Sequence, residues 1–331
     1  MGTKRVEWID NARAIAAVLV ICLHIPNYQI CKDLINSFVL PTFFILSGMT
    51  FSYKGENFCE YLKKKCAILV WPSFILCGIL NKVFEFVYSS IIGVECNVNI
   101  KNVVMGTVLQ LRGSYEFGAW FLICLFSSQI IIYFLIKYII KSIKHILLFT
   151  IISYVLGNAY SVLIHKVLPW SLDVALIAVS YILLGYYIKE AKIIDRVLKK
   201  KNIILYLAMF CIGNTLAIVN NRVISLYLNN LGNPFVEILT ILGGAGTIAI
   251  ICNEIKQNKV LEFIGKNSLI IYCTQYFIIY ILDNTLQMDN LLIKVIIYLV
   301  ITLIGTTLLS YIINRFFPVL IGKKPIRNEL L

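Results

Sequence analysis

Long apolar segments recur from one end of the chain to the other, and they constrain its fold more than any other feature. Segments of about twenty residues match the length at which a helix crosses the hydrocarbon core of a bilayer. The chain has 331 residues, of which 60% are hydrophobic and only 14% are charged. A soluble domain has about 25% charged residues. A soluble fold would leave hundreds of apolar residues without a core, so we predict an all-α integral membrane protein.

The apolar segments predict a bundle of about ten transmembrane helices, which we assign to a single domain over residues 1–331. The first segment follows a short basic start and contains Arg13. It lacks a small-residue cleavage site, so we predict a retained first helix in place of a signal peptide. The ten predicted spans are 9–25, 34–51, 66–92, 120–136, 146–163, 172–188, 203–219, 235–251, 269–282 and 291–313.

Basic residues alternate between the loops that join these spans. One set of loops holds 22 of the 30 lysines and arginines, whereas the other set holds six. Cytoplasmic loops are enriched in lysine and arginine, so we predict ten spans with both termini in the cytoplasm. The net charge of +13 then reflects topology, and no nucleic-acid partner is expected. We predict a multi-pass protein of the cytoplasmic (inner) membrane, with the basic loop 189–201 against anionic lipid headgroups.

The ten cysteines indicate neither a disulfide framework nor a metal site. None of them forms a C-x-x-C pair, and most fall within apolar segments. Cysteine in such a segment behaves as a small hydrophobic residue. We therefore expect no bound metal and no bound cofactor.

The first predicted helix carries three ionisable residues, which are costly within a membrane and indicate a functional site. Asp10 and Arg13 are three residues apart and can pair on one helix face. Arg13 and His24 are eleven residues apart, which returns to within roughly 20° of the same face, about 16 Å further along the axis. One face thus presents a cation near the cytoplasm and an imidazole deeper in the membrane.

Structural explanations exist for these two side chains as well. Arg13 can extend towards the near interface, and His24 can form an interhelical hydrogen bond. The chain has three histidines, and His145 and His165 both fall in predicted loops. His24 alone lies in a span, where an imidazole can accept a proton from a hydroxyl nucleophile. We therefore favour a catalytic role for His24.

Four further segments complete a pattern that begins with D-x-x-R-A-I-A at residues 10–16 and continues to His24. By itself, the Ser47-Gly48 pair indicates close helix packing, and Trp120 an aromatic residue at the interface. Together the segments resemble the acyltransferase 3 family of membrane O-acyltransferases, and in particular its short branch of sugar and polysaccharide O-acetylases. The four segments are P-T-F-F-I-L-S-G at 41–48, W-F-L at 120–122, the apolar run at 171–185, and I-G-K-N-S-L-I-I-Y at 264–272.

The resemblance implies transfer of an acyl group, usually acetyl from cytoplasmic acetyl-CoA, to a hydroxyl of an extracytoplasmic glycan or lipid-linked sugar. His24 corresponds to the family's catalytic histidine, and Arg13 to the arginine that ten intervening residues separate from it, with Asp10 as the partner of Arg13. Acyl-CoA phosphates and the reacting thioester need cations and hydrogen-bond donors. The candidates for donor binding are Lys63, Lys64, Lys65, Ser47 and Tyr272.

Candidate acceptor-binding residues come from the predicted outer side, where sugar recognition uses carboxylate and aromatic groups. A solvated loop explains several of them equally well. Asp173 also suits the first turn of a helix, where the macrodipole favours a carboxylate. The candidates are Arg112, Tyr115, Glu116, Trp120, Asp173 and Gln275.

Two positions depart from the family pattern. Many relatives carry R-x-x-R before a proline of the third helix, where this chain has Cys66 and Leu69 before Pro72. Many also carry a histidine near the end of the ninth helix, where this chain has Gln275. The lysines at 63–65 are then the remaining candidates for the donor phosphates, and His24 would act without a second histidine.

Two other classes of protein compete with the enzyme. A transporter or flippase for a lipid-linked sugar would use Arg13 and His24 for gating or binding, but no internal repeat is visible. A role as a non-catalytic membrane scaffold does not explain why Arg13 and His24 share one helix face. The identity of the acceptor, the length of the acyl chain and the oligomeric state are left open.

Overall fold

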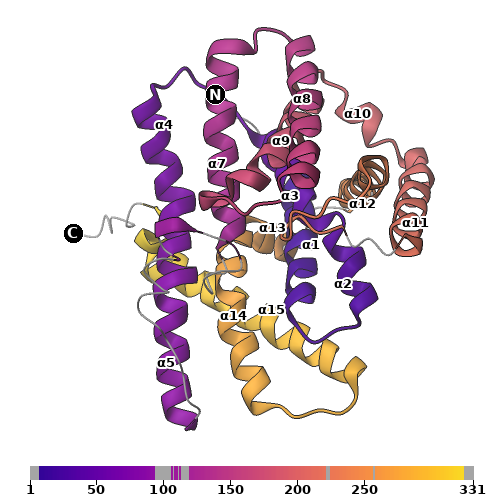
Figure 1. The fold of residues 1–331 in the computed structure, drawn as a ribbon. Coiled ribbons are helices and arrows are strands. Elements are labelled where there is room, and N and C mark those ends of the chain that lie inside the picture. Colours follow the sequence, from indigo (N-terminus) through magenta and orange to yellow (C-terminus); the bar gives the residue numbers. More distant parts are fainter. Residues whose placement is uncertain are drawn as a thin grey trace.

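The computed structural model describes residues 7–93, 106, 108–110, 112, 119–220, 224–255 and 258–323. Every element assigned within these residues is a helix, and Figure 1 shows their arrangement. The α-helices are α1 (Glu7–His24), α2 (Gln29–Asn36), α3 (Val39–Thr50), α4 (Phe58–Lys65), α5 (Asn81–Ile92), α7 (Trp120–Phe134), α8 (Ile143–Leu163), α9 (Leu172–Glu190), α10 (Ile194–Val197), α11 (Ile203–Val219), α12 (Pro234–Glu254), α13 (Lys259–Lys266), α14 (Ser268–Thr285) and α15 (Leu291–Phe316).

Six short elements of π or 3₁₀ type extend or join these helices. Two π segments connect α4 to α5, so that residues 58–92 form the long rod on one side of Figure 1. Pro72 lies between them and lacks a backbone N–H, so the helical hydrogen-bond register changes there. The six elements are η1 (Cys66–Val70), η2 (Ser73–Leu80), η3 (Leu135–Ile139), η4 (Pro169–Ser171), η5 (Lys200–Asn202) and η6 (Pro318–Ile321).

Each predicted span is helical in the structure, but the second is interrupted. The predicted span 34–51 consists of the end of α2 and the whole of α3, with a break at Ser37 and Phe38. The Ser37 hydroxyl donates to the Leu34 carbonyl at 2.8 Å, and Phe38 has non-helical backbone angles. The third predicted helix is also longer than expected, because it begins at Phe58.

Eight helical segments in the described chain are long and apolar enough to cross a membrane. Helices α1 and α14 do not belong to this set. Helix α1 carries Glu7, Asp10 and Arg13, whereas α14 carries Gln275 and Asp283. The count of ten spans and the cytoplasmic position of both termini therefore stay predictions.

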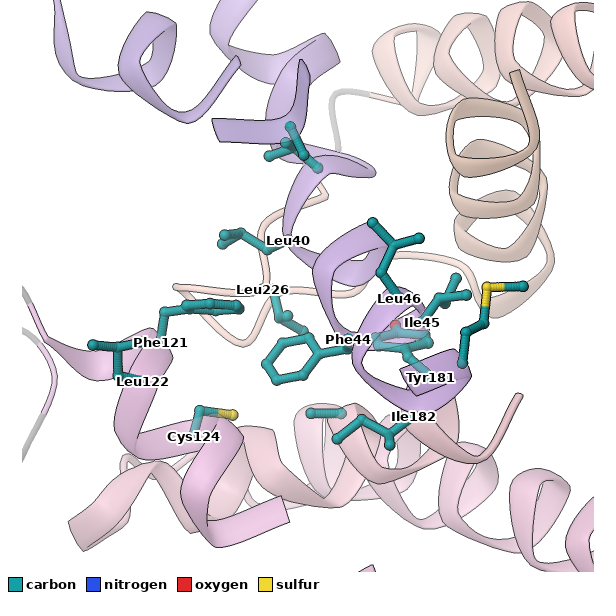
Figure 2. Packing of buried hydrophobic residues seen from close by; sticks show 14 of the residues in the cluster. Leu40, Phe44, Ile45, Leu46, Phe121, Leu122, Cys124, Tyr181, Ile182 and Leu226 are labelled. Atoms are coloured by element: carbon teal, nitrogen blue, oxygen red, sulfur yellow. The ribbon is translucent and has the colours of Figure 1, made fainter. Parts of the chain in front are cut away.

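The larger hydrophobic core centres on α3, which packs against α7, α9 and α12. Figure 2 shows Phe44 of α3 among side chains that include Phe121 of α7 and Ile182 of α9. The rings of Phe44 and Phe121 have centroids 5.0 Å apart. Leu226, from the segment between α11 and α12, also lies in this core.

Two glycines allow α3 and α9 to approach at backbone distance. A Cβ atom on Gly48 would lie 1.9 Å from the carbonyl oxygen of Ile182, and one on Gly185 would lie 2.0 Å from that of Ile45. Small residues permit such close contacts between membrane helices, whose association relies on van der Waals packing. This reciprocal pair fixes the position of α3 on α9.

A second, smaller core joins α1 to α13, α14 and α15, which are labelled in Figure 1. Ala14, Ile21 and Ile25 face this smaller core, whereas Ala12, Ala16 and Val20 face the larger one. Helix α1 therefore lies between the two groups of helices. Gly265 holds α13 against it, because a Cβ atom there would lie 1.9 Å from the Asp10 carbonyl oxygen.

Replacing Gly48 with alanine should destabilise the fold. The added methyl group would overlap the Ile182 carbonyl, and overpacking costs about 1–3 kcal/mol or more. We expect Gly48→Ala to lower the Tm by several degrees in a thermal-shift assay in detergent. Gly305→Ala is the control, because its Cβ would meet only the flexible end of Ile278 at 3.0 Å. Equal Tm values for the two variants would contradict the close α3–α9 contact.

Candidate active site

His24 is the last residue of α1 and faces Tyr276 of α14. The Tyr276 hydroxyl lies 3.2 Å from Nδ1 and 3.1 Å from Nε2 of the imidazole. The two rings are tilted, with centroids 4.8 Å apart. Sequence reasoning missed Tyr276. The sequence could have indicated Tyr276, because it follows the candidate Tyr272 by four residues and therefore lies on the same face of a helix.

Side chains from three other elements interact electrostatically with this pair. Lys32 of α2 interacts electrostatically with His24. The Tyr276 hydroxyl has the same kind of interaction with Cys77 of η2 and with Tyr227, which precedes α12. Helix α1 packs against α2 and α14, and α14 in turn packs against the rod 58–92.

Arg13 lies nearer the opposite end of α1, where it contacts α3. Its guanidinium donates to the Thr50 hydroxyl at 2.9 Å and lies 3.7 Å from the Asp10 carboxylate. Ala17 and Val20, which lie between Arg13 and His24 on the predicted face, are both buried. The predicted ion pair of Asp10 with Arg13 is present. His24 contacts α14 whereas Arg13 contacts α3, so the two side chains lie in different parts of the helix bundle.

Other cations lie beside Arg13, around the loop at residues 51–57. The Lys189 ammonium at the end of α9 donates to the Phe51 carbonyl, and that of Lys64 lies 3.8 Å from the Glu56 carboxylate. Lys65 lies over the ring of Tyr61. Cations of α1, α4 and α9 thus contact residues 50, 51 and 56. We use the name basic cluster for these cations together with the two lysines that flank Lys64 in α4, namely Arg13, Lys63, Lys64, Lys65 and Lys189.

The two predicted oxyanion donors have different neighbours. The Gln129 amide of α7 donates to the Ser47 hydroxyl at 3.1 Å. Tyr272 contacts Phe121 of α7, with ring centroids 5.6 Å apart. Tyr272 shares its helix face with Tyr276, so of the two candidates it is the one that the structure connects to His24.

The predicted outer end contains a buried ion pair between Arg112 and Asp173. Two guanidinium nitrogens bind the two carboxylate oxygens, one at 2.9 Å. The side chains of Arg112 and Asp173 are 2% and 0% exposed. Arg112 also donates to the Tyr227 carbonyl at 2.9 Å and lies over the ring of Trp120. The structure thus brings three predicted acceptor residues together, with two of them satisfying each other's charge.

The remaining acceptor candidates are Gln275, Tyr115 and Glu116. Gln275 is fully buried next to Tyr276 in sequence, and neither of its side-chain polar atoms has a partner among the described residues. A buried amide without partners is costly, which suits a position that binds a ligand. Tyr115 and Glu116 lie outside the described residues, so their predicted role stays a prediction.

The comparisons with known proteins define the class of this protein. A family model described as an acyltransferase domain, that of acyltransferase 3, matches residues 6–315. The chain belongs to this family, as its motifs indicated. It is therefore a membrane acyltransferase with several apolar helices. The comparison with curated proteins and the comparison with solved structures gave no match.

Breaking the buried ion pair should destabilise the protein. Asp173→Asn leaves the buried guanidinium of Arg112 without its counter-charge, and loss of one partner of such a pair costs about 3–5 kcal/mol. We expect a clear drop in Tm by thermal shift. Asp195→Asn, at an exposed position of α10, is the control. An unchanged Tm with reduced turnover would instead support direct contact between Asp173 and the acceptor.

Proposed function

We propose that the protein is an O-acyltransferase that moves an acyl group, acetyl in the first instance, from cytoplasmic acyl-CoA to a hydroxyl of an extracytoplasmic glycan or lipid-linked sugar. The observation that carries the proposal is the arrangement along α1. His24 faces Tyr276 at one end, while Arg13 joins the basic cluster towards the other. This chain, which belongs to the acyltransferase 3 family, thus has an imidazole at one end of α1 and cations towards the other end.

The basic cluster supports binding of the donor. Coenzyme A carries phosphate groups, and charge-assisted hydrogen bonds from lysine and arginine are the strong interactions available for them. Lys63, Lys64 and Lys65 form the last turn of α4, beside the loop that Arg13 and Lys189 contact. We propose that the nucleotide of acyl-CoA binds here, on the cytoplasmic side, and that the thioester extends along α1 towards His24.

The reaction follows from the position of His24. The imidazole takes the proton of the acceptor hydroxyl, whose oxygen attacks the thioester carbonyl. The new C–O bond forms, the C–S bond breaks, and the proton passes to the departing thiolate of coenzyme A. Tyr276 holds the imidazole, and Tyr272 or Ser47 donates to the oxyanion. A covalent acyl intermediate on His24 or Ser47 is the alternative route to the same products.

The proposed location is the cytoplasmic membrane, with no bound cofactor and with acetyl-CoA as co-substrate. His24 is half-buried, and the packing of α2 and α14 against α1 reduces the access of water, which would otherwise compete with the acceptor hydroxyl for the thioester. Membership of an acyltransferase family favours this reaction over transport of a lipid-linked sugar.

Removing the imidazole should abolish turnover without abolishing donor binding. We expect His24→Ala in nanodiscs to retain stabilisation by acetyl-CoA but to lose at least 100-fold in acceptor-dependent release of coenzyme A, the range of general base catalysis being ~10²–10⁴-fold. Arg13→Ala should weaken the stabilisation. His145→Ala, at an exposed position, is the control. If acetyl-CoA does not stabilise the folded wild type, the enzyme proposal is wrong.

Neutralising the lysines of α4 should weaken the binding of the donor and have little effect on the later steps. The triple replacement of Lys63, Lys64 and Lys65 by glutamine should raise the KM for acetyl-CoA roughly ten-fold, with a smaller change in kcat, because it removes ground-state binding of phosphate. The difference from wild type should shrink at high salt. The matched control replaces Lys199, Lys200 and Lys201, another basic triplet predicted to be cytoplasmic. Equal effects of the two triplets would reject a specific donor site.

A further inference from the structure

Gln275 and Ser310 are buried polar residues without a hydrogen-bond partner among the residues that the structure describes. Gln275 of α14 lacks a partner for both its amide oxygen and its amide nitrogen, and Ser310 of α15 lacks one for its hydroxyl group. Both residues are 0% exposed. Unpaired polar groups inside a protein are costly, so each of them needs a physical explanation. The proposed reaction uses neither residue.

Gln275 faces the smaller core, between α1 and α15. It lies four residues from Ile271 and four residues from Ile279, which both belong to this core. Residues four apart share a helix face, so the Gln275 side chain points in the same direction as theirs. The same core contains Ile21 of α1 and Tyr298 of α15.

Ser310 belongs to a row of hydroxyl groups on the covered face of α15. Thr302, Thr306 and Ser310 follow one another at intervals of four residues and are fully buried, whereas Ile304 and Leu308 on the opposite face are exposed. The elements that cover α15 include α14 and α1. The Thr306 hydroxyl donates to the Thr302 carbonyl at 2.7 Å, so within this row the Thr306 proton is already used.

Two contacts set the register between α14 and α15. The Asn314 amide donates to the Asn267 side-chain oxygen at 2.7 Å, and a Cβ atom on Gly305 would lie 3.0 Å from Cδ1 of Ile278. The two helices therefore run antiparallel.

This register places Gln275 beside Ser310. Gln275 comes three residues before Ile278, so it is level with Leu308, which comes three residues after Gly305. With a rise of about 1.5 Å per residue, Gln275 and Ser310 differ by only about 3 Å along the axis. They do not bond to each other, since both lack a partner among the described residues. Two such groups on facing helices suit a ligand that binds between them.

The end of α15 near Ser310 connects to the basic cluster. The Lys323 ammonium donates to the Asn314 side-chain oxygen at 2.6 Å, and the Asn314 amide donates to the Ser310 carbonyl at 2.7 Å. Gly322 lies against the rod, because a Cβ atom there would be 2.0 Å from the carbonyl oxygen of Ala67. Ala67 follows the lysines of α4 by two residues.

The other side of this site is the candidate catalytic histidine. Gln275 directly precedes Tyr276, whose hydroxyl lies 3.1 Å from Nε2 of His24. The unpaired groups of Gln275 and Ser310 therefore lie between cations that suit phosphate and an imidazole that suits acyl transfer.

We propose that Gln275 and Ser310 bind the amide-containing arm of the acyl-CoA donor, which passes between α14 and α15 from the basic cluster to His24. The inference rests on the proposed acyl transfer, and it assigns Gln275 to the donor in place of the acceptor. The arm joins the phosphates of coenzyme A to its sulfur atom. A glutamine side chain offers both a donor and an acceptor to an amide group of this arm, and a serine hydroxyl offers both as well.

A comparison of two ligands isolates the contribution of the arm. Coenzyme A carries the arm, whereas adenosine 3′,5′-bisphosphate keeps the nucleotide and lacks it. Wild type, Gln275→Met and Ser310→Ala in nanodiscs are titrated with both ligands by calorimetry. We expect the affinity for coenzyme A to fall about ten-fold in Gln275→Met and about five-fold in Ser310→Ala, because hydrogen bonds to the arm are lost. The affinity for adenosine 3′,5′-bisphosphate should not change.

Two further variants serve as controls. Thr302 is also buried and without a partner among the described residues for its hydroxyl, but it lies six residues from Leu308, about 9 Å along the axis from the level of Gln275. Thr302→Val should therefore leave both affinities unchanged. The triple replacement of the lysines of α4 by glutamine should weaken both ligands, because both carry phosphate.

The stability of the ligand-free protein provides an independent readout. Removing a buried polar group that has no partner should not destabilise the fold. We expect Gln275→Met and Ser310→Ala to have a Tm at or above that of wild type without ligand. A lower Tm for both variants would show that other groups of the protein already pair with these atoms, which would overturn the proposal.

The binding results separate this inference from the proposed function. If wild type binds coenzyme A and the variants bind it equally well, or lose affinity for both ligands alike, the path between α14 and α15 is wrong while acyl transfer stands. An equal loss of coenzyme A binding in Thr302→Val and Ser310→Ala would also overturn the path. If wild type does not bind coenzyme A, both proposals are wrong.

Discussion

Ionisable side chains are costly within a membrane unless other helices cover them, and the packing of α1 between two cores supplies such cover. One side of α1 faces the larger core and the other faces the core formed with α13, α14 and α15. The close contact of Gly265 with the Asp10 backbone brings α13 against α1. Arg13 and His24 are thereby held within the protein, where their charge and basicity can serve a reaction.

The two ends of α1 have different electrostatic surroundings. Around residues 51–57, several cations bind carbonyl, hydroxyl and carboxylate groups and leave a net positive surface, which suits the phosphates of a donor. At the other end, Arg112 and Asp173 neutralise each other in a dry environment and hold Tyr227 in place. The proposed entry of the donor follows from this asymmetry.

Sequence patterns predicted the helices well because apolar length and charge are local properties. The predicted span 203–219 coincides with α11, and the tenth predicted span begins where α15 begins. The break at Ser37 and Phe38 was missed, because a side-chain hydrogen bond and one non-helical residue interrupt an apolar segment without altering its composition. The count of ten spans stays a prediction, because α1 and α14 carry polar groups and fall outside the eight helical segments of the described chain that are long and apolar enough to cross a membrane.

Local patterns of residues are enough to predict a helical membrane protein and to place Arg13 and His24 on one face of its first helix. The 3.6-residue period and the cost of charge within lipid are sufficient for both conclusions. The interaction partners of the site residues depend on tertiary packing. Tyr276 is 252 residues from His24, and Asp173 is 61 residues from Arg112. Such pairs depend on which helices pack together, and this packing rests on backbone contacts at Gly48, Gly185 and Gly265 that no local pattern specifies.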